Sequence, residues 1–575
     1  MDATEPAVVL MKTAHDVDVI VVGSGITGGW AAKELTEQGF SVLVLDRGRY
    51  IEHGRDYSGE HMPPWQVPFG GRPLRELYRE EYPIQSQCYA FNETTRHFWN
   101  NDRDNPYVIT PDKPFNWIRA GVIGGKSLLW GRQVYRWSDL DFEANKRDGH
   151  GIDWPIRYRD LAPWYSHVER FVGVSGQKEG LAQLPDGEFL PPMEMFAVEK
   201  AAKQAIERNF PGRRLTIGRV ANLTQPHQGR AACHYCGVCH RGCSAGAYFC
   251  SLSSTLPAAK ETGLMTLLAD CVVEGLDYDA KVRRVTGVRV IHARTRARTT
   301  YRARMVFLCA STIGSTQILL NSRSESFPTG LANRSGVLGR YLMDHWYQVQ
   351  TKGVVPGFAD TYYEGLRPNG IYLARFRNLQ GQDPDADFVR GYGYQGGASR
   401  MEWPQMSATT AGFGAQYKQA LRQPGPWQFN LGAFGECLPY RENMLSLDEK
   451  RVDRFGIPLV KFDFRWGENE RKGKADALRQ AQAMLRSMGA EQITAVDRNS
   501  PGGNCIHEMG TARMGLDPAQ SVLNGWNQAH DILNLYVTDG ASMASSSCVN
   551  PSITFMALTA RAASHAAAQL KSGRL

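Results

Sequence analysis

The chain has 575 residues, which is too many for one compact hydrophobic core, so two or more intertwined domains are expected. Hydrophobic residues make up 42% of the chain, as in ordinary globular proteins, and no apolar run reaches the ~18 residues of a membrane helix. The net charge is +8, but the densest basic stretch, residues 294–304, alternates with small and polar residues as on the solvated face of a hairpin strand, which argues against nucleic-acid binding.

The amino-terminal residues 1–16 contain neither a basic n-region nor a twin arginine. We therefore expect that the chain carries no export signal of its own. It then either stays in the cytoplasm or is carried out folded by a partner.

Residues 16–46 predict a strand, a tight turn, a helix and a second strand. The apolar run 17–22 is typical of a buried parallel strand, and it leads directly into the sequence GSGITG. Gly23 permits the turn, Gly25 lets the backbone approach a pyrophosphate, and Gly28 lets helix pack on strand. The second strand ends on Asp46, where a carboxylate would bind a ribose hydroxyl pair. These features indicate a dinucleotide site without saying which dinucleotide binds.

The chain then leaves the nucleotide unit and returns to it. Residues 50–116 are rich in Pro, Arg and aromatic side chains and show little periodicity, which predicts a long excursion. The segment 117–130 contains the pair Gly124-Gly125 followed by Ser127, which suggests a second backbone approach to the cofactor, although an ordinary glycine turn is the alternative. Residues 154–168 predict a turn and an amphipathic helix.

The second half alternates between the two expected domains. Residues 264–290 predict strand pairs, and the buried strand 305–310 leads into a helix, which suggests a return to the nucleotide sheet. Residues 341–500, with a helix at 471–485, are assigned to a substrate-facing domain. Near the end, Asn550 and a proline at the first helical turn predict a helix N-terminus able to stabilise negative charge.

Four of the eleven cysteines fall within eleven residues: Cys233, Cys236, Cys239 and Cys243. Their C-x2-C-x2-C-x3-C spacing is typical of loops that wrap an iron–sulfur cluster, with either three or four irons, although Ser244 stands where a proline often follows. Zinc is the main alternative, with His234 and His240 as further ligands, but structural zinc usually takes two separated pairs. Free or disulfide-bonded cysteines remain a third possibility. The other seven show no framework spacing and are expected to be buried thiols.

Five motifs resemble the glucose-methanol-choline (GMC) flavin oxidoreductases, in the family's order and over nearly the whole chain. They are the amino-terminal glycine fingerprint, the Gly124-Gly125 segment, LGRYLMDH ending at His345, HxxGTxxMG opening at His507, and the VTDG strand followed by NPSIT from Asn550. The resemblance implies FAD and an α/β fold, in which a Rossmann-like FAD-binding domain is intertwined with an α+β substrate domain carrying an antiparallel sheet. The expected division is 14–150 (FAD domain, with the excursion at 50–116), 151–225 (substrate/cap helices), 226–340 (iron–sulfur loop and second FAD part), 341–500 (substrate domain) and 501–575 (last FAD part, with the catalytic His and Asn).

The resemblance also assigns cofactor contacts to matching positions. It places the pyrophosphate at Gly23, Gly25 and Gly28, the ribose at Asp46, the flavin beside Gly124, Gly125 and Ser127, the adenine near Val273, and the ribityl and pyrophosphate near Asp539 and Gly540, with Arg47, Ala310 and Pro551 completing the set. Some members attach FAD through a histidine after the glycine pair. Here Leu128, Leu129 and Trp130 stand nearby, so non-covalent FAD is expected.

The family's catalytic pair maps onto His507 and Asn550. Hydride transfer from a carbinol carbon requires the hydroxyl proton to leave, and an imidazole suits that base role. Asn550 would hold the hydroxyl oxygen through its amide N–H. For His345 a structural role is favoured.

The expected activity is that of an FAD-dependent dehydrogenase that oxidises a secondary hydroxyl of a sugar or glycoside. The C3 hydroxyl is the first choice, because Leu128-Leu129-Trp130 differs from the segment of glucose dehydrogenases that oxidise the anomeric carbon. An iron–sulfur cluster would pass electrons singly to an external acceptor, which favours a dehydrogenase over an oxidase. Aromatic side chains that could stack on a sugar, or simply pack, are Trp346, Tyr347, Trp403 and Trp427.

The cysteine-rich insertion is similar to that of catalytic subunits of bacterial sugar dehydrogenases, including glucoside 3-dehydrogenases. That likeness implies a small exported subunit, a cytochrome c acceptor and a periplasmic location, with the cytoplasm as the alternative. Two other functions stay open: an oxygen-using sugar, glycoside or alcohol oxidase, and an electron-transfer or assembly subunit without an alcohol substrate of its own.

Overall fold

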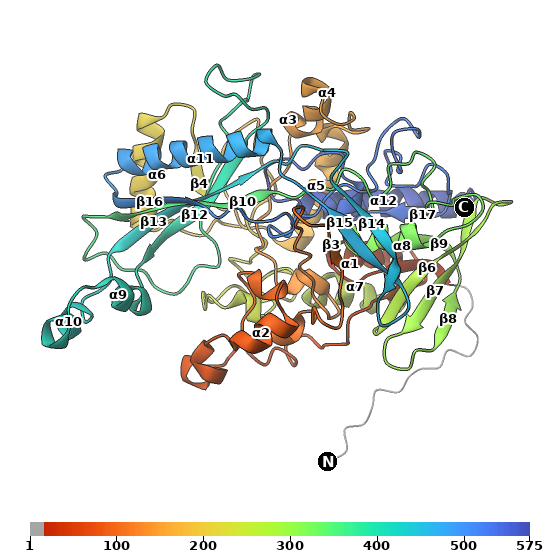
Figure 1. Cartoon of the computed structure of the whole chain (residues 1–575), viewed down its shortest axis with the longest axis horizontal. Helices are drawn as coiled ribbons and strands as arrows, with labels where there is room; N and C mark the ends of the chain where they lie inside the picture. The colour runs from red at the N-terminus through yellow and green to blue at the C-terminus, as the bar shows by residue number, and fades with distance from the viewer. Residues whose placement is uncertain (1–16) are drawn as a thin grey trace, which may run out of the picture.

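The computed structural model describes residues 17–575 (Figure 1). Residues 1–16 lie outside the described part. They are the segment for which no export signal is expected, and they include Asp16 at the start of the fingerprint. Within residues 17–575, none of the helices is both long enough and apolar enough to cross a membrane.

A five-stranded parallel sheet forms the nucleotide-binding half. Its strands, in spatial order, are β17 (Leu535–Val537), β9 (Ala303–Leu308), β1 (Val17–Val22), β2 (Val42–Leu45) and β5 (Met265–Leu268). The central strand β1 pairs with β2 on one side and with β9 on the other, so that Val19 lies between Val42 and Met305. The runs of valine and leucine in β1 and β2 are almost fully buried, because helices cover both faces of a parallel sheet.

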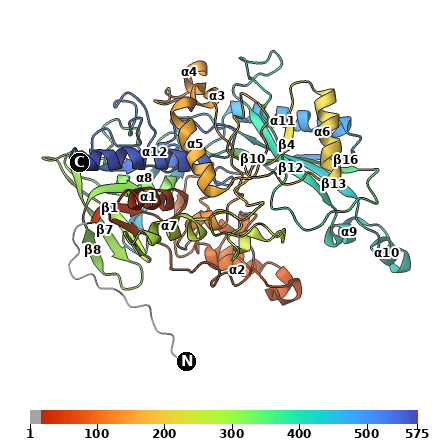
Figure 2. The ribbon, with the colours of Figure 1, turned by 180° about the vertical axis from the view of Figure 1, so that it is seen from behind.

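Helices from distant parts of the chain surround this sheet. They are α1 (Ile26–Glu37), α5 (Tyr158–Val172), α7 (Thr255–Glu261), α8 (Thr312–Asn321) and α12 (Ser552–Lys571). The helix α1 contacts both α7 and α12, and α12 also contacts α5. Figure 2 shows α12, α5 and α1 crossing the same region from behind. The carboxyl-terminal helix therefore closes the nucleotide domain that the amino-terminal strand begins.

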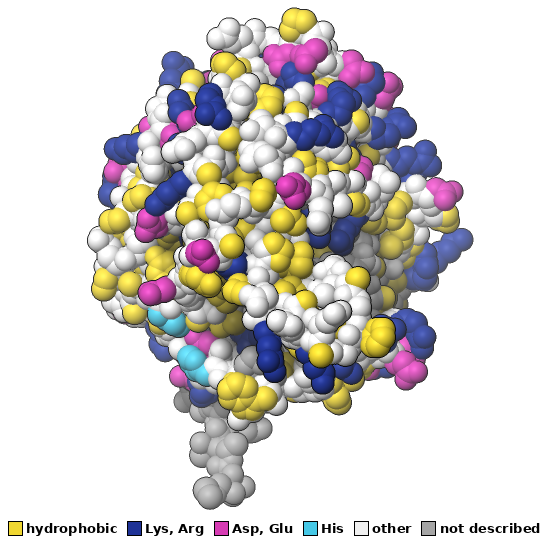
Figure 3. Space-filling view, turned by 90° about the vertical axis from the view of Figure 1, so that its left-hand side faces the viewer, with side chains coloured by type: hydrophobic (Ala, Val, Ile, Leu, Met, Phe, Trp, Pro, Cys, Tyr) yellow, Lys and Arg dark blue, Asp and Glu magenta, His cyan; other side chains and the backbone are white. Residues whose placement is uncertain are grey.

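A six-stranded antiparallel sheet lies at the other end of the long axis (Figures 1 and 2). Its spatial order is β16 (Glu491–Asp497), β10 (Trp346–Val355), β13 (Trp427–Gly435), β12 (Tyr392–Arg400), β11 (Ile371–Leu373) and β4 (Leu215–Ile217). The helices α6 (Ala197–Asn209) and α11 (Glu468–Ser487) pack on it and share its hydrophobic core. Figure 3 views this end of the molecule, where side chains of both charges are interspersed with hydrophobic ones.

Two three-stranded sheets and several short helices complete the fold. The sheets are β14 (Met444–Val452), β15 (Pro458–Asp463) and β3 (Val108–Ile109), and β6 (Cys271–Asp279), β7 (Arg284–His292) and β8 (Arg298–Tyr301). The remaining α-helices are α2 (Arg75–Glu81), α3 (Asp139–Phe142), α4 (Ala144–Asp148), α9 (Trp403–Thr409) and α10 (Gly414–Ala420). The 3-10 turns are η1 (Pro64–Gln66), η2 (Pro68–Gly71), η3 (Gln85–Gln87), η4 (Arg96–Phe98), η5 (Gly125–Leu128), η6 (Cys239–Arg241), η7 (Ser251–Ser253) and η8 (Gly540–Ser542).

The mixed α/β architecture confirms the predicted fold class, with a parallel nucleotide sheet and an antiparallel substrate sheet. Residues 264–290 form paired strands, as predicted: β5 joins the parallel sheet, and β6 and β7 form an antiparallel hairpin. The strand β4, from the expected substrate/cap segment, is an edge of the substrate sheet, and β15 pairs with β3 of the excursion.

Candidate active site

A cavity of about 720 Å³ runs along the carboxyl end of the parallel sheet and reaches the antiparallel sheet. Ligands of open α/β folds bind at this edge, where the strands end and the loops diverge. The predicted site residues that line it are Gly23, Gly25, Asp46, Arg47, Gly125, Ser127, Val273, Ala310, His507, Asp539, Gly540 and Asn550. Gly28, Gly124 and Pro551 are not among the lining residues.

The glycines of the first turn differ in what a side chain would meet. At Gly28 a Cβ would lie 1.8 Å from the carbonyl oxygen of Gly23, so this position holds the helix against the strand. Gly23 itself has φ +98°, a left-handed conformation that favours glycine. A Cβ at Gly25 would meet only the oxygen of Gly124, at 3.9 Å, because Gly25 faces the cavity. This cradle at the start of α1 fits a pyrophosphate.

Asp46 lies at the end of β2, open to the cavity but anchored at both oxygens. Its Oδ2 accepts hydrogen bonds from the backbone N and Oγ of Ser24, at 2.8 and 2.5 Å, and its Oδ1 accepts one from Gly48 N at 2.6 Å. Burial raises the pKa of Asp46 despite these bonds. The neighbouring Arg47 donates to Asn105 Oδ1 at 2.8 Å. Asp46 therefore holds the glycine turn itself, in addition to the ribose contact expected of it.

Ser24 was not predicted, although it joins the two glycine segments. Its Oγ accepts a hydrogen bond from the backbone N of Gly124 at 2.9 Å. Gly124 and Gly125 both have positive φ, +83° and +53°, and open the turn η5. Ser127 then donates to the Gly124 carbonyl at 2.5 Å. Ser24 occupies a variable position of the glycine pattern, so its contact with Gly124 had no signal in the spacing.

The end of β17 supplies the opposite wall. Asp539 accepts hydrogen bonds from Ser315 Oγ at 2.5 Å and from Ala541 N at 3.0 Å, and burial raises its pKa to about 6. A Cβ at Gly540 would lie 2.3 Å from the Glu508 carbonyl, so only glycine allows this close approach. Pro551 is the N-cap of α12, and the following Ser552 lines the cavity in its place.

His507 and Asn550 come together at the cavity. The amide Nδ2 of Asn550 lies 3.4 Å from His507 Nε2. Burial lowers the pKa of His507 well below its usual value, and the proximity of His345 and Lys126 adds to the effect, so the imidazole is neutral at pH 7. A neutral imidazole beside an amide donor can accept a hydroxyl proton while the amide holds the oxygen.

The antiparallel sheet contributes residues that the sequence did not reveal. Gln395 of β12 lines the cavity and donates its Nε2–H to Asn550 Oδ1 at 2.6 Å. This bond turns the Nδ2 of Asn550 toward His507. The sequence around Gln395 is typical of a core strand, so it did not identify Gln395 as a site residue.

The predicted sugar-stacking aromatics are mostly structural. Trp346 and Trp427 are 2% exposed and belong to the core of the antiparallel sheet, which rules out a contact with substrate. Trp403 lies on α9, 63% exposed and away from the cavity lining. Only Tyr347 of the four lines the cavity.

Asp344, next to the end of the LGRYLMDH motif, holds in place the loop that leads to His507. Asp344 accepts hydrogen bonds from the backbone N–H groups of Gly503, Cys505 and His507, at 2.8, 3.2 and 3.0 Å. Burial and the nearby Glu508 raise the pKa of Asp344 to about 7. These three hydrogen bonds to one carboxyl group fix the backbone position from which the imidazole of His507 projects.

The cysteine loop packs behind the wall of the same cavity. All four thiols are free; Cys239 and Cys243 are buried, Cys233 is half-buried and Cys236 is exposed. The two buried cysteines share a hydrophobic cluster with Leu129, which lines the cavity.

The thiols are not drawn together as a single ion would require. In the described part of the chain, the only three potential ligand atoms of His, Cys, Asp or Glu within 4.8 Å of one another are those of His345, Cys505 and His507, which hydrogen-bond to each other. A tetrahedral zinc with Zn–S of ~2.3 Å needs closer thiols than the loop provides. The four thiols lie on a glycine-rich loop in which Gly237 and Gly242 have positive φ.

Comparisons with known proteins agree with this geometry. Two models described as GMC oxidoreductase match residues 17–347 and 439–559. A 2-methyl-1,2-propanediol dehydrogenase of Mycolicibacterium austroafricanum is 29% identical, over 96% of this chain and 95% of its own length. The fructose dehydrogenase large subunit of Gluconobacter japonicus is 26% identical over 97% and 98%, and the paromamine 6'-oxidase of Streptomyces fradiae is 26% identical over 96% and 92%.

Solved structures share the fold at low sequence identity. A pyridoxine 4-oxidase from Mesorbium loti has a TM-score of 0.57 and 14% identity, covering 96% of this chain and 99% of that one. A formate oxidase from Aspergillus oryzae has a TM-score of 0.58 and 14% identity, covering 97% and 99%. This likeness concerns the fold alone.

Proposed function

The chain belongs to the GMC oxidoreductase family, and we propose that within it this protein is an FAD-dependent dehydrogenase that oxidises a secondary hydroxyl of a sugar or glycoside. The observation that carries the proposal is the pair formed by His507 Nε2 and Asn550 Nδ2, 3.4 Å apart at the cavity wall. Similarity to a fructose dehydrogenase large subunit and to a gluconate 2-dehydrogenase flavoprotein supports a polyhydroxylated substrate.

The roles of the residues follow from their chemistry. The family binds FAD, which when bound supplies the hydride acceptor, and the cradle formed by Gly23, Gly25 and Asp46 would hold it without a covalent bond. Asn550 donates its Nδ2–H to the substrate hydroxyl oxygen. His507 Nε2 accepts the hydroxyl proton as the carbon loses its hydride and becomes a carbonyl. The product of a glycoside oxidised at C3, our first choice of carbon, is a 3-keto glycoside.

Anaerobic flavin reduction tests this proposal. Purified protein is mixed with a panel of hexoses and methyl glycosides, and flavin bleaching is followed by absorbance, with the product identified by NMR. His507→Ala is expected to lower the reduction rate roughly 10²–10⁴-fold, since it removes the base. His150→Ala, which changes an exposed histidine, is the matched control. Near-normal reduction in His507→Ala would remove His507 from the base role.

We propose further that an iron–sulfur cluster, [3Fe-4S] or [4Fe-4S], held by Cys233, Cys236, Cys239 and Cys243 carries electrons away from the flavin. Its support is the ligand spacing together with the position of the loop against Leu129 in the cavity wall. A cytochrome c as acceptor, a small exported partner subunit and a periplasmic location are parts of the same proposal. The relatives described as a large subunit and a flavoprotein suggest partner subunits.

Iron and acid-labile sulfide per chain, measured on protein purified without oxygen and followed by electron paramagnetic resonance, test the cluster. Iron with matching sulfide is the expected result. Protein without iron but with rapid oxygen consumption would instead favour the second candidate, an oxygen-using oxidase. The similarity to the paromamine 6'-oxidase supports that candidate.

A further inference from the structure

Two buried imidazoles meet through the same kind of nitrogen. His345 Nδ1 lies 2.9 Å from His507 Nδ1, with the rings nearly perpendicular, at 80°. Two lone pairs cannot face each other at this distance, and neither can two N–H groups. One nitrogen must therefore donate and the other accept.

The second nitrogen of His345 decides which of them donates. His345 Nε2 lies 2.9 Å from the backbone carbonyl oxygen of Ser546, which can only accept a hydrogen bond. The His345 proton must therefore sit on Nε2. Burial lowers the pKa of His345 to about 4, so the ring carries a single proton at pH 7 and its Nδ1 presents a lone pair.

We propose that His345 is a positioning residue that selects the tautomer of His507. The His507 Nδ1–H donates to His345 Nδ1, which leaves the lone pair of His507 on Nε2, facing Asn550 and the cavity. The opposite tautomer would direct an N–H at the substrate oxygen and compete with the Asn550 amide. The importance of this selection for catalysis rests on the proposed function, but the tautomer itself does not.

Cys505 lies beside this pair without replacing it. Its Sγ is 3.2 Å from His507 Nδ1, and burial raises the pKa of the thiol well above its usual value, so it stays protonated. If Cys505 donated its S–H to His507 Nδ1, the two histidine lone pairs would face each other at 2.9 Å. The thiol sulfur can therefore serve only as a weak second acceptor.

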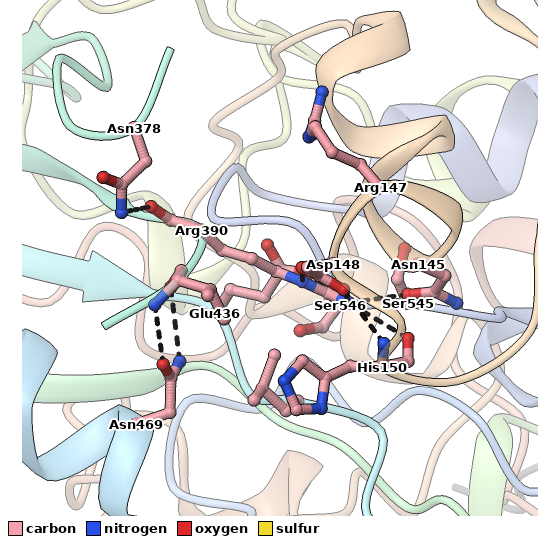
Figure 4. Close-up of polar contacts among 12 residues, drawn as sticks. Asn145, Arg147, Asp148, His150, Asn378, Arg390, Glu436, Asn469, Ser545 and Ser546 are labelled. Carbon is pink, nitrogen blue, oxygen red and sulfur yellow. Dashed lines mark hydrogen bonds and ion pairs between the residues drawn. The ribbon is translucent and has the colours of Figure 1, made fainter. Parts of the chain in front are cut away.

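The carbonyl that orients His345 is held by both domains. Ser546 Oγ accepts a hydrogen bond from the backbone N of Cys437 at 3.1 Å and donates one to the Cys437 carbonyl at 3.0 Å. The preceding residue, Glu436, pairs with the buried Arg390, which also donates to Asp148 at 2.7 Å (Figure 4). The acceptor of the His345 proton is thus fixed by packing.

Nitrogen-15 NMR of the FAD-loaded protein, labelled with [15N]histidine, tests the tautomer directly without substrate. The His507 signals are assigned by difference with His507→Ala. We expect a protonated Nδ1 and an unprotonated Nε2 in the wild type. A wild-type His507 protonated at Nε2 would overturn the proposal.

Two variants of His345 connect the tautomer with the rate. His345→Gln keeps an oxygen acceptor toward His507 and an N–H donor toward Ser546, so the tautomer and the rate of flavin reduction should stay within roughly 10-fold of wild type. His345→Phe removes both groups, and reduction by the best sugar of the panel should fall roughly 10²–10⁴-fold at an unchanged FAD content. The solvent deuterium isotope effect should rise, because proton transfer becomes limiting.

The outcomes separate this inference from the proposed function. An unchanged tautomer in His345→Phe, or a rate equal to that of the wild type, would overturn the role of His345. If no sugar reduces the wild-type flavin, the proposed substrate class fails, while the NMR result still decides the tautomer. FAD content and the melting temperature of both variants guard against a loss of rate through misfolding.

Discussion

Gly25 and Gly28 lie three residues apart in one turn, yet a methyl group added at each should have a different effect on stability and on FAD binding. Gly28→Ala drives a Cβ to within 1.8 Å of a backbone oxygen, so we expect the apoprotein to lose at least ~1–3 kcal/mol of stability. Gly25→Ala meets only Gly124 O, at 3.9 Å, and should leave the apoprotein melting temperature unchanged while weakening FAD binding roughly 10-fold or more. Calorimetry of the apoprotein and FAD titration measure the two effects, and equal melting temperatures for both variants would contradict the assignment.

The pH dependence of flavin reduction follows from the surroundings of His507. Burial, His345 and Lys126 lower its pKa. Glu508, which pairs with Lys126 at 2.8 Å, faces the same loop. So does the carboxyl group of Asp344, whose pKa is raised to about 7 and whose protonation as the pH falls removes a negative charge and lowers the pKa of His507 further. The base form of a group with a lowered pKa persists as the pH falls. The anaerobic reduction rate should therefore stay constant from pH 8 to about 6 and fall only in more acid solution, in contrast to a free histidine with a pKa near 6.5. Stopped-flow measurement that finds a midpoint at or above pH 6.5 would contradict this.

At the scale of single elements, the cavity is built where segments of several elements meet. The turn after β1, the turn η5, the end of β17 and the strand β12 all reach it. The cysteine loop around η6 is an additional element that packs behind this wall through a hydrophobic cluster. In the proposed function this loop carries electrons away from the flavin and does not bind substrate.

Serine substitutions in the loop test that role. Cys239→Ser and Cys243→Ser should each lower the iron content and the rate of electron transfer to cytochrome c, while leaving anaerobic flavin reduction by sugar within a few-fold of wild type. Cys88→Ser is the matched control, since Cys88 is a buried thiol of the same hydrophobic cluster outside the ligand spacing. Equal iron contents in all three variants would exclude the loop cysteines as ligands.

At the scale of the whole molecule, a buried ion network ties the antiparallel sheet to the short helix α4. Arg390, 3% exposed, donates to Glu436, to Asp148 and to Asn145 (Figure 4). Although burial opposes it, hydrogen bonding to Arg390 lowers the pKa of Asp148. Glu436 of this network precedes Cys437, which hydrogen-bonds to Ser546, and the Ser546 carbonyl in turn contacts His345.

Removing this arginine should destabilise the entire protein. Arg390→Leu leaves two carboxylates without their cation, so we expect a loss of about 3–5 kcal/mol in the free energy of unfolding, measured by the urea midpoint. Arg323→Ala breaks the exposed pair with Glu449 and should cost no more than ~1 kcal/mol. Similar losses for both variants would show that the buried Arg390 network contributes no more to the free energy of unfolding than an exposed ion pair.

Local patterns were sufficient for much of the fold and part of the site. The strand, turn and helix around Gly23 could be predicted because the left-handed φ of Gly23 and the contact of Gly28 with the Gly23 carbonyl are demands within the segment itself. Helix α11 was predicted at 471–485 and spans Glu468–Ser487, since its amphipathic period is a local property. By contrast, Trp346 and Trp427 were candidates for sugar binding but are core residues. The sequence alone does not distinguish an aromatic side chain that packs in the core from one that binds a sugar.

By itself the sequence predicted the nucleotide cradle from glycines and an acid at short spacings, and the family resemblance of its motifs predicted His507 and Asn550. Only the tertiary structure decided how these groups face one another. His345 and His507 are 162 positions apart, and Gln395 and Asn550 are 155 apart, so their contacts arise from the packing of the two domains. The tautomer of the catalytic base is set at that level, because a proton's place on an imidazole depends on which acceptor the fold brings within hydrogen-bonding distance.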